Sequence, residues 1–250
     1  VLVQDRGVLG GNASSEIRMW ICGAHGKDNR ETGIIEEIML ENFFQNPQLS
    51  YSLWDMVLFD KTSRQDNLTL LLNTSCLDAN TENGKIISIT AWQSPCETVH
   101  TIKARYFADC SGDSILSTLT GAHFRYGREA ESEFGESIEP KTADKKTMGM
   151  SCLFQVRETD KPQKFTPPEW AYKYCTDDDI PFREHDLSSN FWWIETGGEG
   201  DCIHDTDKCR DELLKIAYGV WDHIKNHGDH GAENYELEWV GILPGKRESR

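Results

Sequence analysis

The segment that follows the first apolar residues is rich in glycine and small polar side chains. Residues 1 to 5 read as a short buried strand, and Gly10, Gly11, Asn12 and Ser15 lie in the loop after it. Glycine lets a backbone approach a bound ligand closely, because it has no side chain to intervene. The pattern indicates a nucleotide-contacting loop, and an ordinary strand-to-helix connection is the alternative.

A second turn of similar composition comes at the end of a later strand. It runs from Asp109 to Asp113 and leads into an apolar segment that we expect to be a short helix beginning at Ile115 and closed by Gly121. Backbone amides at the start of a helix favour a polar or anionic ligand. The alternative role for Asp113 is to cap that helix.

Cations gather near the end of a chain that is otherwise strongly acidic. Arg247 and Arg250 lie in the segment 244–250, whereas the whole chain has a net charge of −16. Arginine orients anionic or hydroxylated substrates through two parallel hydrogen bonds. The group that these cations meet is a substrate carboxylate, a cofactor carbonyl that gains charge or an internal acid such as Glu195, and a salt-bridged surface strand is the alternative.

Two adjacent tryptophans stand beside a carboxylate. Trp192 and Trp193 precede Glu195 and are candidates for a wall on which a sugar ring stacks, although tryptophans are more often part of a core. His25, in a glycine-containing loop, and Glu195 are candidates for handling a proton. Glu195 and Asp201 form the carboxylate pair that a carbohydrate hydrolase or lyase would need.

Three histidines near the end of the longest expected helix have a spacing that could place ligands on one helical face. They are His223, His227 and His230, but Gly228 interrupts the helix between them. No nearby cysteine or carboxylate completes a zinc pattern. We therefore expect no metal site.

Apolar spacing predicts the elements that position these residues. We expect helices over 31–46 and 207–227, with apolar side chains at helical spacing in both. Residues 55–108 are expected to be β-structure, with apolar runs at 57–59 and 68–72 and a hairpin turn at Asn83–Gly84. Another strand is expected over 148–156, where a second region begins.

The composition is globular, with 38% hydrophobic and 27% charged residues among 250. The acidic balance argues against binding to nucleic acids or anionic membranes, because both require clustered lysine and arginine. No apolar run approaches the roughly 20 residues of a membrane helix. The eight scattered cysteines are expected to be mostly buried thiols, and the sequence does not decide between cytoplasm and periplasm.

Several motifs together are characteristic of one enzyme family. They are Leu9–Glu16, Ala108–Glu129, Trp192–Glu195 and Pro244–Arg250. As a set they resemble the FAD-dependent oxidoreductases related to glutathione reductase and succinate dehydrogenase, and most of all a bacterial subgroup of FAD-dependent dehydrogenases associated with polysaccharide degradation. The resemblance spans essentially the whole chain and implies FAD bound across a doubly wound sheet.

The resemblance also implies roles for individual residues. Gln4 takes the position that faces the adenosine ribose, Cys76 lies near adenine, Gly10, Gly11 and Ser15 approach the pyrophosphate and flavin, and Ser111 and Gly112 pack along the cofactor. Neighbouring residues Asp5, Arg6, Asn12 and Asp113 are counted with them. Flavoproteins usually have Glu at the ribose position, so Gln4 loses a charge-assisted contact.

The expected organisation is an α/β fold with a partial doubly wound, Rossmann-like FAD-binding domain and a β-meander over residues 1–145. A mixed α+β, substrate-facing region follows over 146–250. Because the phosphate-binding GxGxxG turn would precede Val1, we expect a fragment that alone holds little FAD and is inactive, whereas the intact protein binds FAD.

The expected activity is hydride transfer between flavin and a small polar metabolite, namely a sugar, polyol or hydroxy acid, in carbohydrate metabolism. Trp192, Trp193 and Arg250 would contact that substrate, and Arg247 would orient it. A hydrolase or lyase, or a non-catalytic fragment acting in assembly, are the alternatives. A homo-oligomer is one further option for partners.

Overall fold

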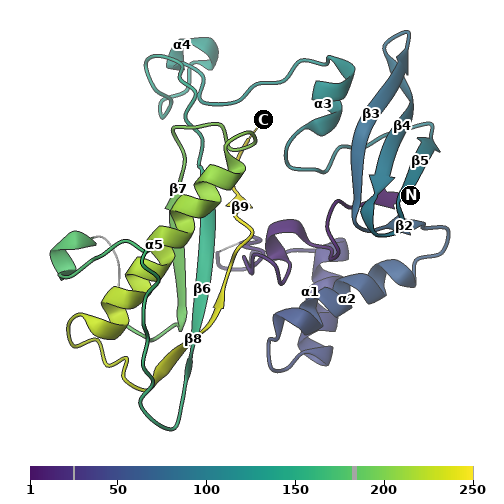
Figure 1. Ribbon diagram of the computed structural model, residues 1–250. Coiled ribbons are helices and arrows are strands. Elements are labelled where there is room, and N and C mark those ends of the chain that lie inside the picture. The colour runs from purple at the N-terminus through teal and green to yellow at the C-terminus, as the bar shows by residue number, and fades with distance from the viewer. Residues whose placement is uncertain (25, 182–184, 250) are drawn as a thin grey trace. The chain divides into compact units, whose positions relative to one another are not determined.

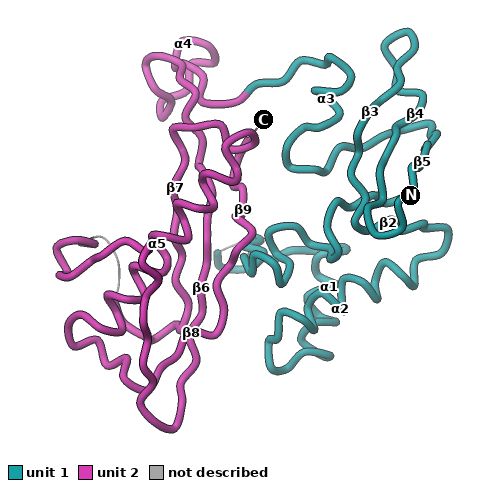
Figure 2. Tube along the Cα trace, viewed as in Figure 1, with its two compact units in different colours: residues 1–125, 250 teal, residues 126–249 magenta. Residues whose placement is uncertain are grey.

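A computed structural model describes residues 1–24, 26–181 and 185–249. The chain forms two compact units, residues 1–125 (unit 1) and residues 126–249 (unit 2), as Figure 2 shows. The sequence analysis places the boundary later in the chain, after residue 145. In the described part of the chain, no helix has both the length and the apolar character needed to cross a membrane.

Unit 1 contains a short parallel pair and an antiparallel sheet (Figure 1). β1 (Leu2–Val3) pairs in parallel with β2 (Leu70–Leu71). β3 (Thr74–Glu82), β4 (Lys85–Gln93) and β5 (Thr98–Lys103) form a sheet in that order. The expected hairpin is confirmed, because Asn83 and Gly84 both adopt left-handed conformations between the paired residues Glu82 and Lys85.

Two helices that precede this sheet in the sequence pack against each other. α1 (Gly33–Gln45) confirms the helix expected over 31–46. α2 (Tyr51–Ser63) corrects the prediction for residues 57–59, which are helical rather than extended. A three-residue apolar run is compatible with either periodicity, and here Trp54, Val57 and Leu58 are buried or half-buried at helical spacing.

Shorter elements connect these parts of the chain. They are η1 (Gly11–Ala13), η2 (Ser94–Cys96), α3 (Ile115–Thr120), α4 (Glu131–Phe134) and η3 (Asp177–Asp179). α3 ends at Gly121, whose left-handed conformation confirms the expected helix stop. The turn that precedes α3 is therefore held between β5 and a short helix, as the sequence predicts.

Unit 2 is a helix packed on an antiparallel sheet. β6 (Met150–Glu158) pairs with β7 (Phe191–Thr196) on one side, and with β8 (Tyr235–Val240) and β9 (Gly245–Lys246) on the other. α5 (Thr206–Asn226) lies along this sheet, as Figure 1 shows. The strand over 148–156 and the helix over 207–227 are both confirmed.

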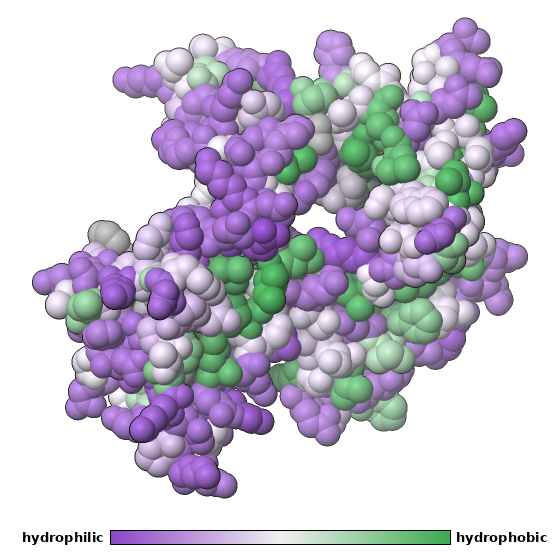
Figure 3. Space-filling view, viewed as in Figure 1, coloured by the Kyte–Doolittle hydropathy of each residue, from purple (hydrophilic) through white to green (hydrophobic). Residues whose placement is uncertain are grey.

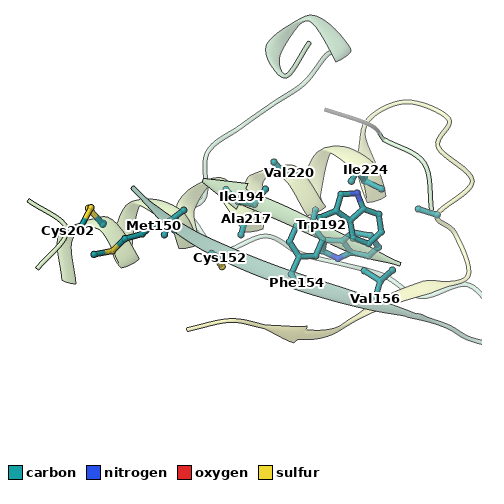
Figure 4. Close-up of a cluster of buried hydrophobic side chains, with 14 residues drawn as sticks. Met150, Cys152, Phe154, Val156, Trp192, Ile194, Cys202, Ala217, Val220 and Ile224 are labelled. Atoms are coloured by element: carbon teal, nitrogen blue, oxygen red, sulfur yellow. The ribbon is translucent and has the colours of Figure 1, made fainter. Parts of the chain in front are cut away.

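The core of unit 2 lies between α5 and the sheet (Figure 4). Phe154 from β6 stacks on Trp192 from β7 with ring centroids 5.0 Å apart, and Trp221 from α5 packs edge-on against Phe154. Ile194 and Met150 extend this layer, and both are fully buried. The alternation of β7 therefore directs Trp192 and Ile194 towards the helix and Trp193 and Glu195 to the opposite face.

The fold is mixed α/β, as expected. In the described residues the parallel pairing is that of β1 with β2, and the other strand pairs are antiparallel. The expectation that most cysteines are buried is wrong. All eight are free thiols and only Cys152, Cys202 and Cys209 are buried, because the others lie in loops and on exposed strands.

Candidate functional site

The glycine-rich loop of unit 1 combines a packed and an open glycine. Gly10 has a φ of 102°, and a Cβ there would come within 2.9 Å of Leu58 on α2. Gly11 also has a positive φ, but nothing lies within 4 Å of the position of its missing Cβ. As the first residue of a 3-10 turn, it also has a backbone N–H without an intrahelical acceptor. A ligand can therefore approach the backbone at Gly11, whereas Gly10 fits the loop against the helix.

Two hydrogen bonds fix the remainder of this loop. The Ser14 hydroxyl is fully buried and donates to the Gly11 carbonyl at 2.7 Å. The Ser15 backbone N–H donates to the Asp55 carboxylate on α2 at 2.9 Å. Because the Ser15 N–H already has this partner, the Ser15 hydroxyl is the donor that remains for a ligand. Asp55 anchors the loop to α2, and the sequence analysis did not identify it.

Gln4 sits where β1 joins its neighbours. Its backbone N–H donates to Leu71 and its carbonyl accepts from Thr74, which links β1 to β2 and to the start of β3. Its side-chain amide donates to the Val8 carbonyl at 3.0 Å. Gln4 therefore braces the glycine-rich loop.

The neighbours of Gln4 differ in exposure. Asp5 is exposed and Arg6 is half-buried. The Arg6 guanidinium lies 3.5 Å from the Gly11 carbonyl and 3.6 Å from the Glu16 carboxylate. Arg6 and Gln4 thus hold the loop from two sides, and Asn12 is half-buried within it.

The turn before α3 is organised by an acid at its first position. The Asp109 carboxylate accepts from the backbone N–H of Ser111 at 3.0 Å and from that of Leu116 at 2.8 Å. Asp109 therefore receives the helix amide, the role that the sequence analysis considered for Asp113. The Ser111 hydroxyl donates to Asp109 and accepts from the Asp113 backbone, and Gly112 is open, with nothing within 4 Å of the position of its missing Cβ.

Cys76 lies on β3, two residues after Thr74, whose backbone N–H donates to the Gln4 carbonyl. Its thiol is half-buried, and burial raises its pKa. A hydrogen bond to the Asp78 carbonyl partly offsets this rise, and the charges of Asp109 and Asp78 add smaller contributions that raise the pKa. α3 contacts β3, so the turn before α3 lies near the strand that carries Cys76. The backbone around Gln4, Cys76 and Asp109 thus converges on one region of unit 1.

A different group of side chains lies on the sheet of unit 2, on the face opposite α5. We call Ser151, Trp193, Glu195 and Arg247 the Glu195 group. The Glu195 Oε1 atom accepts from the Ser151 hydroxyl at 3.1 Å and forms an ion pair with the Arg247 guanidinium. The Trp193 indole N–H donates to Ser151 at 3.0 Å, and the guanidinium lies 5.3 Å from the Trp193 ring centroid.

Strand register explains this grouping. Ser151 on β6 lies opposite Glu195 on β7 and opposite Gly245 on β9, and Arg247 follows β9 by one residue. Of the three partners considered for Arg247, the structure shows the internal acid. Ser151 was missed, because its role depends on a cross-strand register that the sequence does not reveal.

Other predicted residues take different positions. Trp192 is 7% exposed and its ring is covered by Phe154 and Trp221, so it belongs to the core and only Trp193 remains for a stacking wall. His25 and Arg250 lie outside the described residues.

Asp201 is tied to the turn before α5. The Asp201 carboxylate accepts hydrogen bonds from the backbone N–H groups of Ile203 and His204, and it also contacts the His204 imidazole. These bonds lower the pKa of Asp201 to about 2. A carboxylate that stays ionised to such low pH cannot donate a proton near neutrality. Asp201 is therefore excluded as the proton donor of a Glu195–Asp201 pair, and its hydrogen bonds hold it in the turn before α5.

The comparisons with known proteins agree with the resemblance seen in the sequence. A family model described as FAD dependent oxidoreductase matches residues 1–250. Searches of curated proteins and of solved structures each returned no significant match. The chain belongs to the FAD dependent oxidoreductase family, whose cofactor is FAD and whose members are flavin redox enzymes.

Proposed function

We propose that this oxidoreductase transfers a hydride between FAD and a small polar metabolite, namely a sugar, polyol or hydroxy acid. The observation that carries the proposal is the Glu195 group. It combines a carboxylate, a guanidinium and an indole on one face of the sheet in unit 2. These three groups match a substrate that carries hydroxyls and a C–H face.

Unit 1 offers residues that fit the cofactor. The open backbone positions at Gly11 and Gly112 leave room for a ligand to approach without meeting a side chain. We propose that they contact the pyrophosphate side of FAD, with Gln4 near the ribose and Cys76 near adenine. In this proposal the parallel β1–β2 pair belongs to the doubly wound sheet on which such dinucleotides lie.

FAD supplies the hydride acceptor or donor, and the chain binds the substrate and handles its proton. Glu195 uses Oε1 for both Ser151 and Arg247, and within the described residues Oε2 accepts no hydrogen bond. A substrate hydroxyl can donate to Oε2 and pass its proton there as its carbon is oxidised. Trp193 offers an apolar surface for the C–H face, and Arg247 holds the carboxylate in place.

The test is steady-state turnover of the flavin-loaded protein on panels of polyols, sugars and hydroxy acids with an artificial electron acceptor. Arg247→Lys should lower kcat roughly 10²-fold, because a lysine ammonium cannot both pair with Glu195 and lie as a planar group over the Trp193 ring. Glu195→Gln should also lower kcat, and its pH profile should lose the limb that a proton acceptor produces. The flavin absorbance of each variant should be measured as well, because it shows whether a lower kcat reflects slower chemistry or loss of the cofactor.

Arg157→Lys is the matched control, since Arg157 also pairs with a carboxylate, Glu236, across β6 and β8 of the same sheet. Its kcat should be unchanged. Equal losses for Arg157→Lys and Arg247→Lys, or turnover of none of the three substrate classes, would overturn the proposal.

A further inference from the structure

Three histidines and an aspartate of unit 2 converge in a cluster that the flavin chemistry does not use. Asp177 comes from η3, His185 from the loop after it, His223 from the last turns of α5, and His230 from the turn beyond that helix. One nitrogen or oxygen ligand atom from each lies within 4.8 Å of all the others. We call these four residues the histidine cluster.

His223 is oriented so that one ring nitrogen faces the acid. Its side chain is 1% exposed, and its Nδ1 lies 2.9 Å from the Tyr174 carbonyl, which can only accept a hydrogen bond. Nδ1 therefore carries the proton. In the neutral ring, Nε2 then presents a lone pair, and it lies 3.1 Å from the Asp177 Oδ1. Two hydrogen-bond acceptors this close together repel each other, unless a cation or an added proton lies between them.

The other two histidines are also buried and incompletely satisfied. The side chains of His185 and His230 are 13% and 11% exposed, and the Nε2 atoms of both are buried without a hydrogen-bond partner in the described chain. The His185 Nδ1 and His230 Nε2 atoms lie 3.5 Å and 3.6 Å from the same Asp177 oxygen. Of the two unpartnered atoms, the His230 Nε2 faces Asp177, whereas His185 faces Asp177 with its Nδ1 atom. A buried polar atom without a partner is costly, so the His230 Nε2 calls for a ligand.

The three imidazole rings form a closed triangle. Their centroids lie 4.7, 4.9 and 5.1 Å apart. Gly228 makes this packing possible. It has a φ of 87°, and a Cβ there would come within 2.8 Å of the His230 Nε2 atom. The glycine that ends the helix thus turns the chain so that His230 returns to His223.

We propose that the histidine cluster is a structural site for one divalent transition metal ion of the zinc class, bound by three imidazoles and the Asp177 carboxylate. Zinc takes four nitrogen, oxygen or sulfur ligands in a tetrahedron with bonds of about 2.0–2.1 Å, which places ligand atoms about 3.3 Å apart. The three separations from Asp177, 3.1 to 3.6 Å, are close to that value. The wider imidazole separations shorten when the metal binds.

The chemistry of the surroundings agrees with a metal of this class. The Tyr174 carbonyl holds the His223 ring in the tautomer that leaves Nε2 free to coordinate, as carbonyl partners of metal-bound histidines commonly do. Four protein ligands complete a tetrahedron, so the site has a structural rather than a catalytic form. The metal would fasten η3 and the loop at His185 onto the end of α5.

His227 shows that helical spacing alone does not define the cluster. It lies between the two ligating histidines in sequence, but its Nε2 is 3.4 Å from the Asp222 carboxylate instead. The sequence analysis grouped His227 with His223 and His230 and expected no metal site. Two of those three residues belong to the cluster, and the missing ligands, Asp177 and His185, come from a segment far away in sequence.

The test is titration of the chelator-treated full chain with ZnCl₂ by calorimetry, with CoCl₂ as a spectroscopic probe. We expect one Zn²⁺ per chain, a higher melting temperature with zinc, and the visible bands of tetrahedral Co²⁺, which zinc should abolish. His230→Gln and the surface variant Asp177→Asn should each weaken zinc binding by about 10-fold to 100-fold or more, since changes even outside the ligand set reach that size.

The matched controls are His227→Gln and Asp178→Asn, which change neighbouring residues of the same types outside the cluster. Both should bind zinc like the unaltered chain, and circular dichroism should show that all four variants fold. Asp177 is 72% exposed, so its substitution keeps the test decisive even if a histidine variant fails to fold. Absence of stoichiometric zinc binding, or equal losses in the controls, would overturn the proposal.

A melting temperature that depends on pH through these histidines, without any response to zinc, would also overturn it. Such a result would mean that a proton bridges His223 and Asp177 instead of a metal. All of these measurements are independent of flavin and turnover. The metal proposal and the proposed enzymatic function can therefore fail separately.

Discussion

The two units differ in how they bury apolar side chains. Unit 2 has a continuous core between α5 and its sheet, whose members lie between Met150 and Val240. Buried apolar side chains in unit 1 are few among the described residues, namely Ile17, Ile38, Val57, Ile89 and Ala91. Its helices α1 and α2 instead expose large apolar side chains, including Phe43, Phe44 and Met56, and Figure 3 shows apolar surface over this region.

This difference separates two sources of stability. Unit 2 is held by side-chain packing that the unit supplies itself, whereas unit 1 relies more on backbone pairing in its meander and on hydrogen bonds within its loops. A ligand that binds only the folded form adds stability by mass action. In the proposed function FAD contacts unit 1, so bound FAD should stabilise unit 1 more than unit 2.

The largest test of this comparison removes the centre of the core in unit 2. Trp221 is completely buried and packs on Phe154 and Trp192. Trp221→Ala should lower the free energy of unfolding by about 3–5 kcal/mol, as large-to-small changes of aromatic core residues do. Urea unfolding with amide exchange should show that unit 2 opens first, while protection in the β3–β4–β5 sheet persists.

The control for this variant is Trp170→Ala, also in unit 2. Trp170 is 51% exposed, so its loss should cost well under half as much. Simultaneous loss of protection in both units of Trp221→Ala would show that the two cores unfold together, contrary to the comparison.

A smaller effect should separate the same substitution in the two units. Ile194 is fully buried in the core of unit 2, and Ile38 is 9% exposed in the α1–α2 pair. Ile194→Ala should cost about 4 kcal/mol and Ile38→Ala about 2 kcal/mol of unfolding free energy, because side chains around Ile38 can collapse into the vacated space. Urea titration of both variants measures the difference, and equal costs would contradict it.

Sequence reasoning succeeded where an element carries its own signal. The apolar stripe of α5 recurs at helical spacing over many turns, and the Asn83–Gly84 turn requires left-handed conformations that these two residues adopt readily. It failed for α2, because Val57–Phe59 is too short a run to distinguish a strand from a helix.

The functional residues follow the same division. Arg247 and Glu195 were both selected from their residue types, but Ser151 could be added only once the register of β6 and β7 was known. Asp177 and His185 reach α5 through tertiary folding, so helical spacing could not find them. Trp192 and Trp193 are adjacent and of one type, and only strand alternation separates the core residue from the candidate wall.

The smallest expected effect concerns a single carboxyl at the edge of unit 2, away from its core. Burial, with Glu129 and Glu136 nearby, raises the pKa of Glu139 to about 7. The unfolded chain has an ordinary carboxyl pKa near 4.5, so the folded state binds the proton more tightly. The stability that this group contributes is therefore complete below about pH 4.5 and is lost as pH rises through 7.

Glu139→Gln should flatten the decline of the melting temperature between pH 4.5 and pH 7, because the amide remains neutral throughout. Glu131→Gln, which changes an exposed carboxyl of the same segment, is the control and should keep the decline.

The pH dependence of Asp144 is opposite to that of Glu139. Its hydrogen bond with Arg128 lowers its pKa to about 2, so the stability that Asp144 contributes is lost as pH falls below about 4. The segment should therefore be most stable near pH 4, and amide exchange should localise the change to residues 128–144. A change spread through α5 and β6 would mean that this edge is coupled to the core, and would remove the distinction between a core that packing stabilises and an edge that charge controls.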